Sequence, residues 1–343
     1  MTAIRLGAAL AALAIGGNFA GAGNARAIDL HAMHDPISGP AAGAVTSLTG
    51  KAGGLTGKAG GPAGKAGGPT DKAGRLRAVT FKTRSVQSLR LLFDGLGFDL
   101  AGVPKGMPVP RVLVSELPAG LKAMKSVTHR TRMFRKILLP LILQANETIL
   151  RDRETLLALR RKMQIGVSPS VAENGWLWSL ARNYRVRNGD LDTLIMRVDA
   201  IPPSLALAQA IEESGWGTST YARNGNAIFG QETSLSATNA MAGSYRGRAF
   251  KIKTFANLLA AVDAYARNLN THPAYKHMRV ERSMMRARGE QPGGRVLAGT
   301  LLRYSERGPA YIKTIRTIMG NFELPKLDGA ELEPGTTIHV IKR

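Results

Sequence analysis

The sequence contains no cysteine among its 343 residues. A disulfide, a thiol nucleophile, a cysteine-ligated zinc ion and an iron–sulfur cluster are therefore excluded, and so is a lipid anchor on cysteine. The six histidines are not paired with carboxylates at the spacing of a metal site. The glycine-rich tract lies far from any strand–helix junction, so it is not a phosphate-binding loop. The sequence predicts neither a metal nor a cofactor.

Acidic residues are scarce, with 24 Asp and Glu against 47 Lys and Arg, which gives a formal net charge of +23. Such an excess predicts polyanionic surroundings, such as nucleic acid, anionic lipid or acidic cell-wall polymer. The composition is nevertheless 44% hydrophobic, so most of the chain can form a packed core. The length allows one large or two modest domains.

Long apolar runs are absent except at the N-terminus. The run at 6–15 is shorter than the roughly 20 residues that a membrane-spanning helix needs. Arg5 precedes this run, and Ala25-Arg26-Ala27 offers a small-x-small cleavage site. This pattern predicts a signal peptide over 1–27, with a buried N-terminal helix as the alternative. Export favours an envelope partner over nucleic acid and leaves no stable membrane anchor after cleavage.

Residues 28–78 are of low complexity. The sequence Gly-Lys-Ala-Gly-Gly recurs at 50–54, 57–61 and 64–68. Its glycine pairs and prolines stand where a coiled coil requires apolar residues, so we expect a disordered, basic linker. This linker is either an inert tether or a tether that also binds anionic envelope polymers.

The following segments differ in how clearly they predict structure. Residues 79–126 carry short apolar runs broken by Gly and Pro, which indicate small strands or an ordered wrapping segment. Helical periodicity predicts a helical extension over 127–168, kinked or split at Pro140. Trp176 and Trp178 lie in the next helical stretch, and we expect them in the core.

The most informative stretch is 201–230. Pro202 and Pro203 suit the start of a helix, and Gly215 suits its end. Glu213 then lies on the last turn with no Lys or Arg within four residues, and Trp216 follows at once. A helix C-terminus and an aromatic neighbour both raise the pKa of a carboxyl group, as a general acid for glycosidic-bond cleavage requires. A solvated Glu at a helix end is the alternative.

Several motifs carry a family resemblance. The run Glu-Ser-Gly-Trp-Gly-Thr-Ser at 213–219, preceded by Leu-Ala-Gln-Ala at 207–210, resembles the signature of the bacterial glucosaminidase family of peptidoglycan hydrolases. That family includes the cell-wall domain of the flagellar rod-cap protein. Motifs at 201–204, 225–230, 265–275 and 302–311 are similar to those of its Bax group. The resemblance covers about 130–320.

The resemblance implies a mainly α (α+β), lysozyme-like fold. A helical lobe would hold the acid, and a small β-hairpin lobe formed within 231–255 would lie across a glycan groove. The catalytic domain is expected over 169–322. The tail, 323–343, receives no function.

The resemblance also implies roles for individual residues. Glu213 would be the catalytic acid. Tyr311 would orient the substrate's acetamido group or stabilise positive charge at the anomeric carbon, unless it is a core tyrosine. Glu232 is the candidate second carboxylate, but participation of the substrate's 2-acetamido group would need only one protein acid. Glu212 is expected to be a solvated or salt-bridged neighbour.

Four further residues are candidates for substrate binding. They are Trp216, Asn226, Phe229 and Tyr275. The aromatic rings among them would stack on sugars, and a core position for each is the alternative. Ala227 departs from the Asn that close relatives commonly have, which removes one hydrogen bond to the sugar.

The predicted function is that of an exported, periplasmic or envelope-located endo-β-N-acetylglucosaminidase. It would cleave the β-1,4 bond after N-acetylglucosamine in peptidoglycan glycan strands. The alternatives are a muramidase or lytic transglycosylase, and a noncatalytic cell-wall glycan-binding protein. Nucleic-acid binding is not predicted, because no basic–aromatic recognition module is present.

Overall fold

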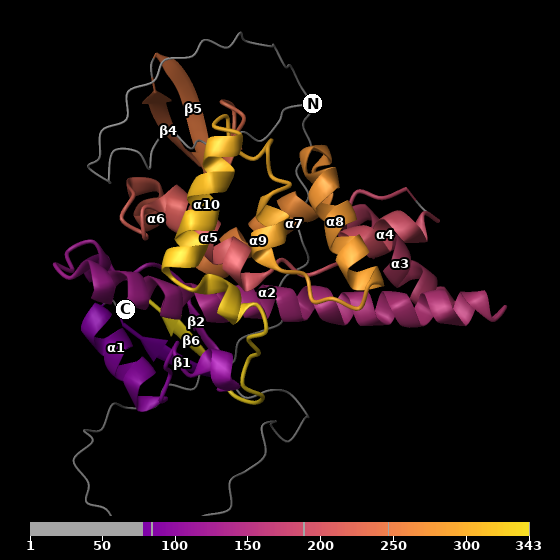
Figure 1. The fold of residues 1–343 in the computed structure, drawn as a ribbon, viewed down its shortest axis with the longest axis horizontal. Coiled ribbons are helices and arrows are strands. Elements are labelled where there is room, and N and C mark those ends of the chain that lie inside the picture. The colour runs from indigo at the N-terminus through magenta and orange to yellow at the C-terminus, as the bar shows by residue number, and fades with distance from the viewer. Residues whose placement is uncertain (1–77, 84, 188, 246, 343) are drawn as a thin grey trace, which may run out of the picture.

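The computed structural model describes residues 78–83, 85–187, 189–245 and 247–342 (Figure 1). The predicted signal peptide and all but the last residue of the predicted linker therefore lie outside the described residues. The rest is mainly α-helical, as predicted, and contains two small sheets. Among the helices in this part of the chain, none combines the length and apolar composition needed to cross a membrane.

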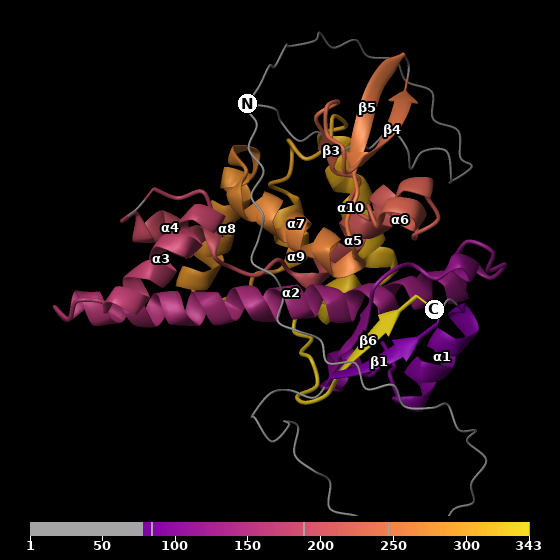
Figure 2. The same cartoon turned by 180° about the vertical axis from the view of Figure 1, so that it is seen from behind.

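A single long helix, α2 (Val127–Gln164), runs through the whole molecule and separates its two parts (Figures 1 and 2). Ser126 caps its N-terminus by accepting from the backbone N–H of His129. The helix is not split at Pro140, because it continues through this residue. Proline has no backbone N–H, so the helix turn at Pro140 lacks one hydrogen bond. All residues from 136 to 143 are buried, and packing on both sides of the helix holds this turn.

Most of the helices lie on one side of α2 (Figure 1). They are α3 (Val171–Asn183), α4 (Leu191–Arg197), α5 (Pro203–Ser214), α6 (Thr220–Gly225), α7 (Leu258–Thr271), α8 (Lys276–Ala287), α9 (Gly294–Ala298) and α10 (Pro309–Asn321). Every residue of α5 is buried, since α2, α9 and α10 pack around it. Trp176 is half-buried, but Trp178 is exposed, so its predicted core position is wrong.

A β-hairpin projects from this lobe (Figure 1). It pairs β4 (Ala240–Tyr245) with β5 (Arg248–Lys253), and the short β3 (Glu232–Thr233) adds to β5 on the other side. All pairs are antiparallel, and Phe250, Ile252 and Ala227 form a small apolar cluster at the base. The helical lobe and hairpin lobe expected of a lysozyme-like fold are both present.

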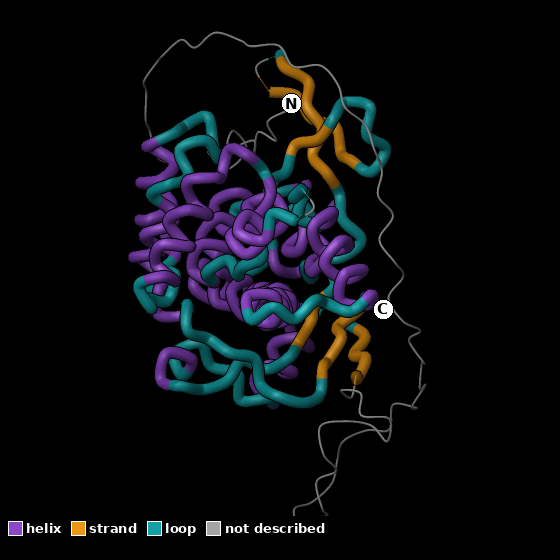
Figure 3. Tube along the Cα trace, turned by 90° about the vertical axis from the view of Figure 1, so that its right-hand side faces the viewer, coloured by secondary structure: helices purple, strands orange, loops and turns teal. Residues whose placement is uncertain are grey.

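A second sheet lies on the opposite side of α2, and the helices separate the two groups of strands (Figure 3). Its strands are β1 (Ala78–Lys82), β2 (Val112–Val114) and β6 (Thr337–Ile341), all parallel, with β6 in the middle. Helix α1 (Val86–Gly95) and the 3₁₀ turns η2 (Val103–Lys105) and η3 (Ala119–Leu121) complete this part. The segment 79–126 and the C-terminal tail therefore form one structural unit.

Candidate active site

The buried helix α5 presents Glu213 on its last turn. Pro202 and Pro203 start the helix, and Gly215 ends it in the left-handed conformation with φ of +56°. Glu213 is 7% exposed. Glu213 is thus a buried carboxyl group one residue before the end of α5.

Two anchors hold the beginning of α5. The carboxylate of Asp328, next to the 3₁₀ turn η5 (Leu324–Leu327), accepts from Ser204 N (2.8 Å), Ser204 Oγ (2.9 Å) and Gly294 N (3.0 Å). Asn146 of α2 exchanges two hydrogen bonds with the backbone of Ile201, at 2.8 and 3.0 Å. The tail and α2 thus fix the helix that carries Glu213.

A chain of buried hydrogen bonds ends on this carboxyl group. Tyr265 Oη donates to Gln209 Oε1 (2.7 Å), and Gln209 Nε2 donates to Tyr311 Oη (3.0 Å). Tyr311 Oη then donates to Glu213 Oε1 (2.9 Å). Gln209 and Glu213 are four residues apart and so lie on the same face of α5. The structure therefore brings together Glu213 and Tyr311, two of the predicted catalytic residues.

The direction of these bonds determines which oxygen of Glu213 carries a proton. Tyr311 has one hydroxyl hydrogen, and the amide of Gln209 donates to its oxygen, so this hydrogen is directed at Oε1. When Glu213 is protonated, its own hydrogen therefore lies on Oε2. Gly230 faces that oxygen, since a Cβ built on it would lie 3.6 Å from Oε2. Gly230 therefore lies next to the oxygen that carries the proton.

Burial raises the pKa of Glu213 to about 8, and Glu212 adds to this increase. The Tyr311 hydrogen bond and the positive charge of Arg307 oppose it. Glu212 is itself buried and pairs with Arg307, whose Nη1 lies 2.5 Å from Oε1. Arg307 also donates to Thr314 Oγ1 on α10 (2.7 Å), which ties the end of α5 to the helix of Tyr311.

Aromatic rings surround the hydrogen-bonded chain. Tyr304 stacks on Tyr311 with ring centroids 5.3 Å apart, and Tyr275 contacts Tyr304 at 5.8 Å. Phe229 stacks on Tyr265 at 3.9 Å with nearly parallel rings. Phe229 and Tyr275, both predicted substrate-binding residues, are buried within this wall. These rings and the hydrogen-bonded side chains are all buried together.

Trp216 points to the other side of the site. Gly215, Trp216 and Gly217 all have positive φ angles, so the chain reverses sharply after α5. The indole then contacts Phe322 at 4.6 Å and Phe134 of α2 at 6.1 Å. The structure therefore gives Trp216 a packing position against α2.

The remaining predicted site residues belong to the loop and the hairpin. Asn226 caps α6 with φ of +52°, and its Nδ2 donates to Phe255 O (3.0 Å). Its buried Oδ1 has no hydrogen-bond partner among the described residues. Glu232 lies on β3, where Arg248 Nη2 donates to both carboxylate oxygens, at 2.8 and 3.0 Å. Glu232 is thus held across the hairpin rather than by the hydrogen-bonded chain.

Two members of the hydrogen-bonded chain, Gln209 and Tyr265, were not among the site residues predicted from the sequence. A signal for Gln209 was available, since it is a polar residue within an apolar stretch and one turn before Glu213. Tyr265 lies on α7, more than fifty residues further along the chain, and only the fold brings it into contact.

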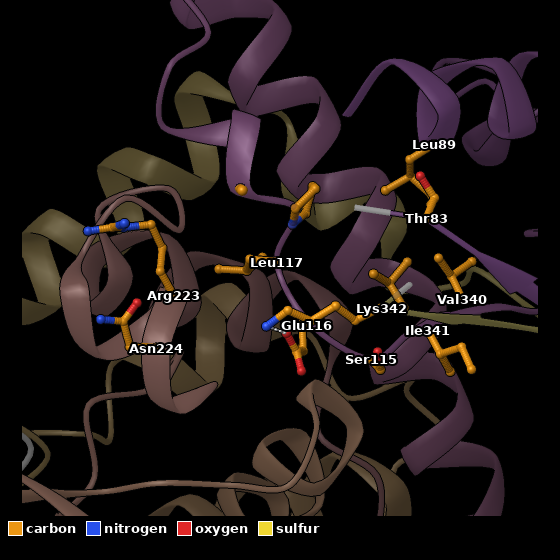
Figure 4. A pocket seen from close by; sticks show the side chains of 13 residues that line it. Thr83, Leu89, Ser115, Glu116, Leu117, Arg223, Asn224, Val340, Ile341 and Lys342 are labelled. Atoms are coloured by element: carbon orange, nitrogen blue, oxygen red, sulfur yellow. Dashed lines mark ion pairs between the residues drawn. The ribbon is translucent and has the colours of Figure 1, made fainter. Parts of the chain in front are cut away.

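A separate cavity of about 220 Å³ lies at the carboxyl ends of β1, β2 and β6, against α6 (Figure 4). The ion pair between Glu116 and Lys342 (3.0 Å) lies at its edge, and none of the predicted site residues lines it. Within the described part of the chain, no three His, Asp or Glu side chains are grouped to hold a metal ion.

Comparisons with known proteins match this region. The family model described as mannosyl-glycoprotein endo-beta-N-acetylglucosaminidase (Glucosaminidase) matches residues 194–324. Protein bax of Escherichia coli (strain K12) is 33% identical over 203 residues, which cover 57% of this chain and 71% of that protein. Among solved structures, the catalytic domain of the autolysin Auto from Listeria monocytogenes aligns with a TM-score of 0.30 and 16% identity, over 50% of this chain and 97% of that domain.

Proposed function

Because this chain belongs to the Bax family of bacterial glucosaminidase-domain proteins, we propose that it is an endo-β-N-acetylglucosaminidase acting on peptidoglycan. It would cleave the β-1,4 bond after N-acetylglucosamine in the glycan strand. One observation carries this proposal: Glu213 is a buried carboxyl group at a helix end, hydrogen-bonded by Tyr311, with its pKa raised to about 8. It is therefore protonated at neutral pH, as a general acid must be.

In the proposed reaction, Glu213 Oε2–H gives its proton to the glycosidic oxygen as the bond from that oxygen to the anomeric carbon breaks. The carbonyl oxygen of the 2-acetamido group attacks the anomeric carbon from the other side and forms an oxazolinium ion. Water then opens this ring, and the Glu213 carboxylate takes the proton of that water. The sum is hydrolysis, with the acid regenerated and one protein carboxyl group used.

The hydrogen-bonded chain has a clear part in this reaction. Negative charge develops on Glu213 as its proton leaves, and Tyr311 Oη already donates to Oε1 (2.9 Å). Gln209 and Tyr265 act as positioning residues, because they fix the direction of the Tyr311 hydroxyl. Donors that need no reorientation stabilise a developing charge most effectively.

Glu232, Trp216, Asn226, Phe229 and Tyr275 have secondary roles in the proposal. The bidentate contact with Arg248 supports a hairpin-stabilising role for Glu232 over that of a second catalytic carboxylate. The buried positions of Phe229 and Tyr275, and the packing of Trp216 on α2, support a role in shaping the site. The unpartnered Oδ1 of Asn226 supports a contact with substrate after a small rearrangement.

We also propose export across the inner membrane, since the substrate lies in the cell envelope. The apolar run at 6–15 and Ala25-Arg26-Ala27 support cleavage after residue 27. The excess of basic residues at 28–78 supports contact with anionic envelope polymers.

The test is mass spectrometry of peptidoglycan sacculi digested with residues 28–343, beside the Glu213→Gln variant. New reducing-end N-acetylglucosamine that is lost in the variant supports the proposal. Reducing or anhydro-muramic ends would assign a muramidase or lytic transglycosylase instead. Binding to sacculi with no released sugar would make the chain a noncatalytic glycan-binding protein.

A further inference from the structure

An apolar patch is exposed where α2 ends and α3 begins. Val171 is 90% exposed, Ile165 78% and Trp178 61%. Met163 and Val167 are also exposed, and we call these five residues the tip patch. Exposed apolar side chains are ordinary when they are scattered, but five within sixteen residues are a concentration of the kind that marks interaction sites.

The tip patch has a defined shape. Ser170 caps α3, and its partner Glu173 also binds Lys162 of α2 at 2.7 Å, which holds the turn against the end of α2. Val171 and Trp178 are seven residues apart on α3 and therefore lie on one face. The end of α2 extends beyond the other helices (Figures 1 and 2). The patch is thus a protrusion rather than a groove.

Exposed arginines lie on the end of α2, on α3 and just after α3. Arg161, Arg182, Arg185 and Arg187 are exposed, and none of them forms an ion pair within the described residues. Two carboxylates of the same region are already occupied, Glu173 by Lys162 and Asp192 by Arg160 at 2.8 Å. Arg182 lies four residues after Trp178, so it continues the same face of α3.

We propose that the tip patch docks this protein on the surface of an anionic phospholipid bilayer. Ile165, Val171 and Trp178 would enter the boundary between headgroups and acyl chains, where tryptophan is favoured. The arginines would lie at the level of the lipid phosphates. A flat, deformable and negatively charged surface matches a basic, apolar protrusion, whereas a protein partner would need a matching concave surface. This inference does not depend on the proposed glycosidase activity.

The experiment is co-sedimentation of residues 28–343, the chain without its proposed signal peptide, with two kinds of vesicle. One contains phosphatidylglycerol mixed with phosphatidylcholine, and the other contains phosphatidylcholine alone. We expect binding to the mixed vesicles and a blue shift of tryptophan emission, both lost in the Ile165→Ser/Val171→Ser variant, and the emission shift lost in Trp178→Phe. Each Arg182→Gln or Arg187→Gln substitution should weaken binding about fivefold.

The control is Leu302→Ser, which removes a leucine that is 53% exposed and lies outside the tip patch. This variant should bind vesicles as the unchanged chain does. Equal binding by the Ile165→Ser/Val171→Ser variant would overturn the proposal and assign lipid binding to another surface, such as the basic segment at 28–78. Tryptophan emission without vesicles is a second check. If Trp178 already emits at short wavelength and is not quenched by a soluble quencher, another segment or protein covers the patch, and the proposal is overturned.

Discussion

Replacing Tyr311 by phenylalanine removes one hydrogen bond from the carboxyl group of Glu213 and keeps the ring. The lost donor is Tyr311 Oη, 2.9 Å from Glu213 Oε1. This bond favours the ionised form of Glu213 and so opposes the effect of burial, which is the main cause of the raised pKa. The variant should therefore have a Glu213 pKa above the present value of about 8.

The size of the change follows from the two protonation states. A hydrogen bond to a charged group contributes about 1.5–3 kcal/mol, against about 1 kcal/mol for a neutral pair. The difference is on the order of 1.4 kcal/mol, or about one pKa unit. If Glu213 is the acid, activity falls as pH rises through its pKa, so the alkaline limb of kcat should move up by about one pH unit. In the transition state, where Glu213 becomes charged, the loss of about 1.4 kcal/mol of hydrogen-bond stabilisation should lower the maximal kcat about tenfold.

The assay is the release of reducing ends from peptidoglycan across a pH series. Gln209→Leu should change the profile in the same direction but by less, because Tyr311 keeps its hydroxyl and loses only its orientation. Tyr304→Phe is the matched control. Tyr304 stacks on Tyr311, and its buried hydroxyl has no partner among the described residues, so its profile should be unchanged. An alkaline limb in Tyr311→Phe that stays in place or moves to lower pH would refute the reasoning.

Three further predictions concern stability. Between about pH 4.5 and 8, the carboxyl group of Glu213 stays protonated in the native state but ionises in the unfolded state, so the free energy of unfolding falls as pH rises. Thermal melts should therefore show Glu213→Gln gaining stability relative to the unchanged protein over this window. Asp199→Ala removes the buried carboxylate that pairs with Arg153, Arg282 and Arg286 and should cost roughly 3–5 kcal/mol in denaturant unfolding, whereas Glu290→Gln, in the exposed pair with Arg288, should leave the unfolding midpoint nearly unchanged. Asp328→Ala removes three acceptor contacts at the start of α5 and should cost roughly 2–4 kcal/mol, with kcat falling in parallel.

The position of α5 could be predicted because its signals are local. Pro202 and Pro203 restrict the backbone at one end, and Gly215 permits a positive φ at the other. Those signals place Glu213 on the last turn without knowledge of any other element. A raised pKa of Glu213 was also predicted, from the helix end and the apolar neighbour, but its largest cause was not. That cause is burial by neighbouring helices, which no local pattern records.

The direction of Trp216 and the role of the tail could not be predicted for related reasons. Three successive positive φ angles direct the indole toward α2, and only glycine positions give any sign of them in a sequence. Strand β6 has five residues and pairs on both sides with strands from the opposite end of the chain. Contacts of such separation depend on the whole fold, so the sequence of the tail alone indicates a strand without a partner.

The parts that sequence reasoning could not assign also explain how the site keeps its geometry. A carboxyl group remains protonated near neutral pH only while its surroundings stay dry and fixed, since water or a small helix shift would restore an ordinary pKa. Helix α5 is held at its start by Asn146 and Asp328, and both residues lie outside the range 194–324 that matches the family model. The long helix α2 and the tail are therefore part of the structure that maintains Glu213, and the functional unit is larger than the matched domain.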